Sequence, residues 1–190
     1  MKEGLIKNTW ELFLKEIQTI LSLLYLLMIG IGMIFNYKKY INFGINIFEY
    51  ADIFHFLIAP FQDIRIIMVS VISLLIPLSV YGLRKAFYSQ FPKLGKKLSL
   101  GLRDKSWYQK ARIIFWGLII IFFISEAALG YANFIKNNLD FQPSVSITYA
   151  DNEKIQGQLL GKTKEVLFLH QAGKVKVIMI TAAVKEIEIL

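Results

Sequence analysis

Residues 113–135 read IIFWGLIIIFFISEAALGYANFI, a run of 23 residues whose only charged side chain is that of Glu126. At a rise of about 1.5 Å per residue, a helix of this length crosses the roughly 30 Å hydrocarbon core of a bilayer. The run therefore predicts a transmembrane helix and places the chain among integral membrane proteins.

Two further runs have the same character. Residues 17–37 contain no charge over 21 positions, and residues 66–83 contain none over 18, with Pro77 in the second half. In a membrane, neighbouring helices can satisfy the carbonyl that a proline frees. The first run is longer than the apolar part of a signal peptide and lacks a small-residue cleavage site after it. We expect an α-helical integral membrane protein with three transmembrane helices, at about 17–37, 66–83 and 113–135.

The composition excludes several other classes. The chain has 190 residues, of which 55% are hydrophobic and 19% charged, and it has no cysteine. Such a chain is neither intrinsically disordered nor a disulfide-stapled scaffold. It has no glycine-rich phosphate loop, and its only histidines are His55 and His170, far apart in the sequence. We expect a protein that is not an enzyme and that carries no cofactor.

The positive charge is concentrated in one segment. Residues 84–112 hold nine Lys or Arg residues and one Asp, a balance of +8 that equals the net charge of the whole chain. Because this segment lies between two apolar runs, it indicates membrane topology rather than nucleic-acid binding. Basic loops stay in the cytoplasm. We expect the N-terminus and residues 84–112 inside and residues 136–190 outside, in a bacterial inner membrane.

The segments between the apolar runs, 41–62 and 84–110, are predicted to lie in the membrane interface. An alternative for 41–62, which is rich in Ile and Phe, is a fourth span that moves the N-terminus outside. Glu49, Asp52 and His55 recur every three residues and share one helix face. They are weak candidates for a metal site, but with no second imidazole or cysteine nearby we expect the wet face of an interfacial helix.

The second interfacial segment carries a lysine cluster. Lys93, Lys96 and Lys97 are predicted to contact anionic headgroups of the inner leaflet. Each cation near such a surface contributes roughly 1 kcal/mol of attraction.

Glu126 is the single-residue candidate inside the bilayer. It stands at position 14 of the 23-residue run, and a charge at that depth costs about 2.5–3.5 kcal/mol on insertion scales. Tyr25 and Ser73 are possible partners at similar depth. Glu126 is either a proton- or cation-handling residue that lines an oligomeric pore, or a protonated side chain whose hydrogen bond fixes helix packing.

From residue 144 the pattern changes to alternation of apolar and polar side chains, as in Val145, Ile147 and Tyr149. Alternation with turn residues between short runs predicts β-strands. We expect a membrane domain at 1–139 and a small, five-stranded, barrel-like all-β domain at 144–190.

Residues 155–169, IQGQLLGKTKEVLFL, resemble the first half of an Sm-like barrel, in which a glycine permits a sharp bend of the second strand. The spacing fits an SH3-like barrel equally well. Residues 174–184, KVKVIMITAAV, stand where RNA-binding members carry an arginine–glycine turn, so the resemblance implies no nucleic-acid partner. Three helices before such a domain also resemble the layout of small mechanosensitive channels. The chain departs from them in the bulky first half of 113–135 and in its predicted external tail.

Two functions follow as hypotheses. The first is a non-enzymatic membrane protein that displays residues 144–190 for binding or assembly with a protein partner, in an envelope or immunity role. The second is a homo-oligomeric channel or membrane-disrupting effector, with Glu126 at the helix interface and the β domain as the sensing or assembly module. In both, membrane lipids are partners.

Overall fold

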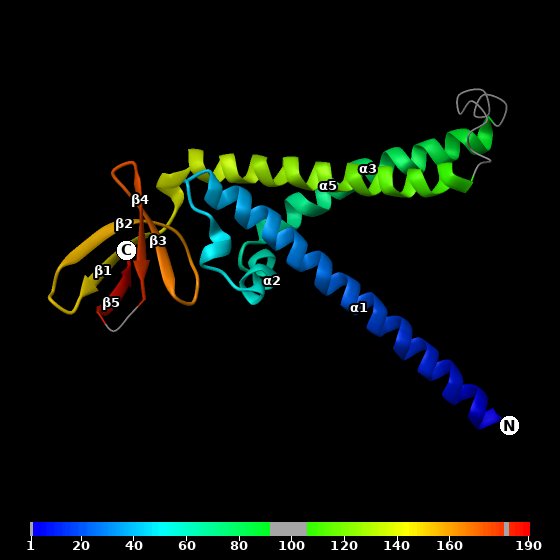
Figure 1. Ribbon diagram of the computed structural model, residues 1–190, viewed down its shortest axis with the longest axis horizontal. Helices are drawn as coiled ribbons and strands as arrows, with labels where there is room; N and C mark the ends of the chain where they lie inside the picture. The colour runs from blue at the N-terminus through cyan, green and yellow to red at the C-terminus, as the bar shows by residue number, and fades with distance from the viewer. Residues whose placement is uncertain (1, 92–105, 181–182) are drawn as a thin grey trace.

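A computed structural model of the protein describes residues 2–91, 106–180 and 183–190. Long helices form the N-terminal part of the chain, and a sheet forms the C-terminal part (Figure 1). The described elements are α1 (Lys2–Ile41), the 3-10 turn Ile47–Glu49, α2 (Ile53–Gln62), α3 (Ile64–Gln90), α5 (Ser106–Asn137), the 3-10 turn Leu139–Phe141, β1 (Ser144–Tyr149), β2 (Lys154–Lys162), β3 (Val166–Gln171), β4 (Lys174–Met179) and β5 (Val184–Ile189).

Three segments of these helices are long and apolar enough to cross a membrane: Lys15–Ile41, Ile64–Gln90 and Lys110–Asn137. They contain the three apolar runs, which confirms the predicted three long apolar helices. In the described part of 84–110, α3 continues to Gln90 and α5 begins at Ser106; the rest of this predicted interfacial segment lies outside the described residues. The described parts of that segment thus belong to the two long helices.

The segment 41–62 does not contain a fourth spanning helix. Its α-helix, α2, has 10 residues and is therefore about 15 Å long, half the thickness of the hydrocarbon core. Asp52 begins α2 by accepting a hydrogen bond from the backbone N–H of His55 at 2.8 Å. Helix α2 lies against α1 at Gly32, where any side chain would collide with the backbone carbonyl of Phe56.

The sheet is antiparallel, with the order β4-β3-β2-β1-β5. All five predicted strands are present, but the predicted barrel is not closed. β4 pairs with β3 and β5 pairs with β1, which leaves β4 and β5 as the two edges. Irregularities in register between Leu159 and Gly161 and between Thr148 and Tyr149 bend the sheet without bringing the edges together.

A shared core fixes the sheet to the helices. The ring of Tyr40, at the end of α1, lies 5.0 Å from the ring of Phe168 in β3, and both side chains are buried. Gly161 of β2 leaves the space that the Tyr40 ring occupies, because a Cβ there would meet the tyrosine hydroxyl. Ile47 and Phe56 complete this core from the loop and from α2. The sheet is therefore packed onto the helices and not merely tethered to them.

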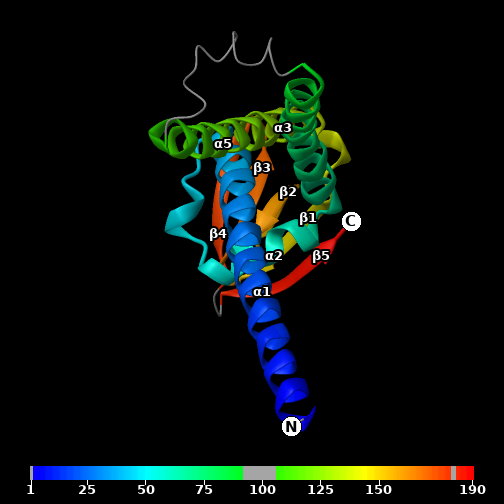
Figure 2. The same ribbon diagram turned by 90° about the vertical axis from the view of Figure 1, so that its right-hand side faces the viewer.

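The helices themselves pack unevenly. A second core joins α1 to α5 through Phe35, Ala128, Tyr131 and Ile135, and α3 runs beside α5 as an antiparallel hairpin (Figures 1 and 2). Away from the sheet, α1 diverges from this hairpin. The apolar side chains of its free part are exposed, as expected where lipid or another chain replaces water; they include Ile20, Leu21, Leu23, Leu24 and Leu26.

Candidate functional site

The free edges of the sheet are the first candidate. β5 is paired on one side only, and all of its residues except Val184 are exposed. Its apolar side chains point into solvent together with that of the following residue: Ile187, Ile189 and Leu190 are 41%, 72% and 62% exposed. At the other edge, Met179 of β4 is 65% exposed. A strand edge with unpaired backbone groups and exposed apolar side chains is a template for pairing with another chain.

A cleft of about 800 Å³ lies beside the β4 edge, between α2 and the β2–β3 hairpin. It is lined by both charged and apolar groups, namely Glu49, Tyr50, Ala51, Asp52, Phe54, His55, Ile58, Gln62, Lys162, Thr163, Lys164, Glu165, Val166, Met179 and Ile180. The cleft has the mixed lining of a surface that contacts a polypeptide, and it adjoins the free edge of β4.

One ion pair joins two of the residues that line the cleft. The Nζ atom of Lys164 lies 3.3 Å from an Asp52 carboxylate oxygen, and both side chains are exposed. The hydrogen bond from the His55 N–H is the main reason that the pKa of Asp52 lies below its usual value, and Lys164 adds to the effect. Burial lowers the pKa of His55, with only partial compensation from Asp52, and so disfavours the charged form of this imidazole.

A polar junction, made by Asp63, Arg65 and Tyr131, ties α3 to α5 close to the sheet. The carboxylate of Asp63 accepts hydrogen bonds from Arg65 at 2.7–3.1 Å and from the Tyr131 hydroxyl at 2.8 Å. Burial alone would raise the pKa of Asp63, but these hydrogen bonds outweigh it and hold the pKa below its ordinary value. The junction is satisfied within the chain, which favours a structural role.

The predicted intramembrane set, Glu126, Tyr25 and Ser73, is not brought together. The Ser73 hydroxyl donates to the carbonyl of Ser70 in its own helix at 2.8 Å. Tyr25 is exposed on the divergent half of α1. Glu126 is exposed on α5, and within the described ranges no hydrogen bond or ion pair involves it. Its buried neighbours on α5, Ala128 and Tyr131, face α1 instead.

Two of the three weak metal candidates have partners elsewhere. Glu49 accepts a hydrogen bond from the Asn46 side chain at 2.9 Å, and Asp52 caps α2. Across residues 2–91, 106–180 and 183–190, no group of three or more His, Cys, Asp and Glu side chains is arranged to hold a metal ion. The predicted lipid contacts Lys93, Lys96 and Lys97 lie outside the described residues.

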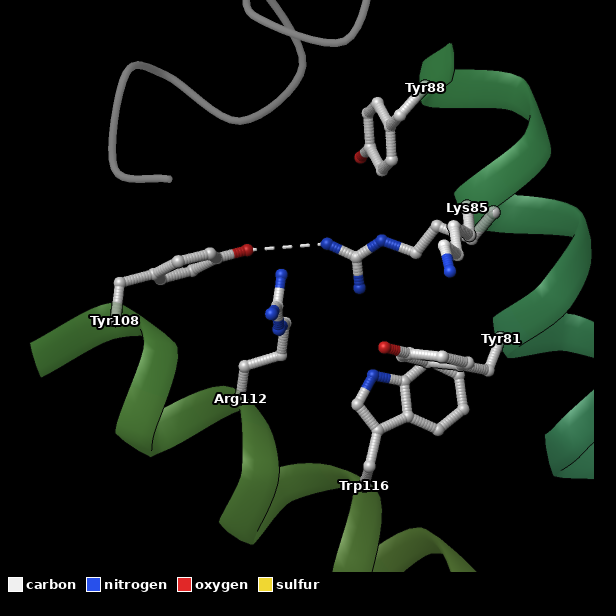
Figure 3. Close-up of a pocket in the computed structure, with 7 residues that line it drawn as sticks. Tyr81, Lys85, Tyr88, Tyr108, Arg112 and Trp116 are labelled. Atoms are coloured by element: carbon white, nitrogen blue, oxygen red, sulfur yellow. Dashed lines mark hydrogen bonds between the residues drawn. The ribbon is translucent and has the colours of Figure 1, made fainter. Parts of the chain in front are cut away.

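The structure also reveals a pocket of about 180 Å³ between the end of α3 and the beginning of α5 (Figure 3). In the sequence, its basic residues indicated only membrane topology and were not combined with the aromatic residues near them. A signal was present: on each helix an arginine stands between two aromatic residues on one face. These are Tyr81, Arg84 and Tyr88 on α3, and Tyr108, Arg112 and Trp116 on α5.

Comparison with protein-family models gives no match to this chain, and no curated protein sequence matches it significantly. Its function is therefore argued from the geometry of these sites.

Proposed function

We propose that this protein is a non-enzymatic, multi-pass membrane protein whose C-terminal sheet binds a protein partner along a free strand edge. The observation that carries the proposal is the exposure of β5 on both faces together with its unpaired edge. A partner strand added there would gain backbone hydrogen bonds from the edge and apolar contacts from Ile187 and Ile189. The rigid attachment of the sheet through Tyr40 supports the proposal, because a fixed edge loses less entropy on binding.

The proposed orientation places the sheet outside the cell and the α3–α5 turn in the cytoplasm. The N-terminal end of α1, the end of α3 and the beginning of α5 all lie away from the sheet (Figure 1), which agrees with an internal N-terminus and an internal basic segment. Because the chain has no cysteine, a single introduced cysteine reports on which side of the membrane its position lies. A membrane-impermeant maleimide is expected to label Asp151→Cys in intact cells and Ser89→Cys only after permeabilisation; the reverse pattern overturns the orientation.

Partner binding is tested by a photoreactive amino acid at Ile189 in cells that express the full chain. We expect a cross-linked product heavier than the chain by a mass that is not a multiple of 21.9 kDa. Ile187→Lys is expected to reduce its yield at least tenfold, because a charge facing the added strand opposes pairing. The same photoreactive group at Phe141, which is 84% exposed but outside the sheet, is the control for unspecific capture.

A second function, a homo-oligomeric channel, is favoured by one observation. Glu126 is an exposed carboxylic acid in the apolar part of α5 and has no partner within the described ranges. Exposure to lipid at that depth is costly, and an aqueous pore or a facing copy would remove the cost. Gly130 and Asn133 continue the same exposed face toward the sheet.

Ion flux through proteoliposomes separates the two functions. A channel predicts flux that falls at least tenfold in Glu126→Gln and stays unchanged in Ser125→Ala, with cross-linked products that are multiples of the chain mass. The proposed partner-binding function predicts no flux and a product that persists in Glu126→Gln. The absence of both flux and any edge-dependent product contradicts both functions.

A further inference from the structure

The pocket between α3 and α5, here called the loop-end pocket, has an unusual chemical lining. It is formed by three basic side chains, three tyrosines and one tryptophan: Tyr81, Arg84, Lys85, Tyr88, Tyr108, Arg112 and Trp116. In Figure 3 Lys85 and Arg112 extend from the two helices toward one space, and Arg84 lines the same pocket; among the described residues, no carboxylate lines it. Three cations converge on a volume of about 180 Å³.

The pocket is held in shape by contacts among its own members. Nη2 of Arg84 donates a hydrogen bond to the Tyr108 hydroxyl at 3.3 Å, across the gap between the helices. The guanidinium carbon of Arg84 lies 5.3 Å from the centre of the Tyr88 ring. The rings of Tyr81 and Trp116 meet edge to face at 5.3 Å. These contacts orient the arginine but do not neutralise it, because tyrosine hydroxyls and ring faces carry no net charge.

No acidic residue on either helix compensates this charge. α3 has none, and the only one in α5 is Glu126. Glu126 lies 14 residues from Arg112, or roughly 21 Å along the helix. The first turn of α5 also has no acidic residue, although the amino end of a helix favours negative charge. The charges of the loop-end pocket are thus complementary to an anion.

A second observation points to a ligand. The indole Nε1 of Trp116 is buried and is one of two buried side-chain polar atoms in the described part of the chain without a hydrogen-bond partner. In Figure 3 this nitrogen faces the pocket, beside the Tyr81 hydroxyl. A buried N–H without an acceptor is unfavourable, because burial removes its hydrogen bonds to water and nothing replaces them. An anionic oxygen in the pocket would supply the acceptor.

The shape of the neighbouring surface selects the kind of anion. An apolar groove of about 390 Å³ continues from the pocket toward the middle of the α3–α5 hairpin. It shares Tyr81, Arg112 and Trp116 with the pocket and is otherwise lined by Pro77, Leu78, Ile113, Gly117 and Ile120. A ligand that fills both must be anionic at one end and apolar at the other. Both lie on helices apolar enough to cross a membrane, with the basic part toward the helix ends.

We propose that the loop-end pocket binds the phosphate of an anionic phospholipid and that an acyl chain of the same lipid lies in the adjoining groove. Arg84 and Arg112 donate hydrogen bonds to the phosphate oxygens, since guanidinium groups match phosphate geometry. Lys85 adds a point charge, and the Trp116 N–H gains its acceptor. This site goes beyond the proposed function and does not depend on it, because it requires only that α3 and α5 cross the bilayer.

The test is native mass spectrometry of the purified full chain in detergent with defined lipids. The probes are phosphatidylglycerol, phosphatidylcholine with the same acyl chains, and inorganic phosphate as competitor. We expect phosphatidylglycerol to be retained at least tenfold more than phosphatidylcholine. Arg84→Gln combined with Arg112→Gln is expected to remove this preference, whereas Lys110→Gln, an exposed lysine of α5 outside the pocket lining, is expected to keep it.

The groove has its own matched pair of variants. Gly117 lines it, and Gly82 does not; a Cβ at either position meets open space. Gly117→Leu is expected to occupy the groove and to reduce lipid retention at least fivefold, while Gly82→Leu leaves retention unchanged. Circular dichroism and gel filtration of each variant verify that it is folded. If an arginine variant loses lipid for a reason unrelated to the pocket, the Gly117→Leu and Gly82→Leu pair still tests the site.

Three results overturn the proposal. The first is equal retention of the two lipids by the unmodified chain. The second is an equal loss in the double arginine variant and in Lys110→Gln, which would indicate attraction by overall charge alone. The third is full competition by inorganic phosphate together with an unaffected Gly117→Leu variant, which would assign the pocket to a soluble phosphate and not to a lipid.

Discussion

Charged side chains have different surroundings at the two ends of the helical part of the molecule. At the sheet end, formed by α2, the adjoining ends of α1, α3 and α5, and the sheet, carboxylates meet cations: Asp63 with Arg65, and Asp52 with Lys164. At the loop end, Arg84, Lys85 and Arg112 converge, and no carboxylate from the described part of the chain lines their pocket. The packing of α1 also differs between the two ends. It is buried against α5 and the sheet at one end and diverges from the other helices at the other.

We therefore expect the charged groups at the sheet end to stabilise the fold and those at the loop end to bind a ligand. A polar group whose partners lie in its own chain contributes to folding, and its loss is felt as instability. Cations held together without a counter-ion repel one another unless a ligand supplies the charge. Variants at the sheet end should therefore change stability, whereas variants at the loop end should change binding.

The largest effect is expected at the core that joins the sheet to the helices. Phe168→Ala removes a fully buried ring that contacts Tyr40 and Tyr50 and should cost about 3–5 kcal/mol of unfolding free energy. Phe141→Ala, at a position that is 84% exposed, is the control and should change it little. The measurement is unfolding in detergent followed by near-ultraviolet circular dichroism. Equal stability of the two variants would show that the sheet is not anchored there.

A smaller effect is expected where α1 meets α2. Gly32→Ala places a methyl group against the Phe56 carbonyl and should destabilise the protein by about 1–3 kcal/mol through overpacking. Gly30→Ala, where a Cβ meets nothing within 4 Å, removes the same helix-weakening glycine without the collision and should not destabilise it. Thermal unfolding of both variants under one set of conditions measures the difference. The close contact is refuted if Gly32→Ala is as stable as Gly30→Ala.

The smallest effect is a pH dependence confined to the sheet end. Because the pKa of Asp63 is lowered in the folded protein, its contribution to stability is complete above its ordinary pKa of 3.8. That contribution is lost as the pH falls through the lower, folded value. Asp63→Asn should cost about 1 kcal/mol at pH 7, since Arg65 is half exposed, and the cost should shrink below pH 4. Melting temperatures between pH 3 and 7 test this; a constant difference between the two proteins over that range contradicts it.

Some elements were predictable because each depends on local sequence. The three long helices follow from uninterrupted apolar runs, and the five strands follow from alternation and turn residues. Barrel closure was not predictable, since it depends on whether two strands distant in sequence meet at an edge. The length of α3 beyond residue 83 was also missed, because hydropathy marks the apolar part of a helix and not its end.

The candidate sites show the same division. Glu126 was identifiable from sequence as a charge inside an apolar run, but only the fold shows that it faces outward while Ala128 and Tyr131 face α1. Asp52 and His55 suggested metal ligands until the fold assigned the carboxylate to a helix cap and to Lys164. The partners of these side chains come from other elements or from backbone groups, which spacing along the chain does not reveal.

By itself, the sequence determined that this protein has three helices able to cross a membrane, a concentration of positive charge between the last two, and a five-stranded C-terminal part. Hydropathy, charge and periodicity are local quantities, and a single chain displays them directly. The tertiary structure alone decided which charges are paired, which strand edges stay open, and that Arg84 and Arg112 meet beside an apolar groove. Those outcomes depend on contacts between segments far apart in the chain, and such contacts arise only when the helices and strands pack against one another.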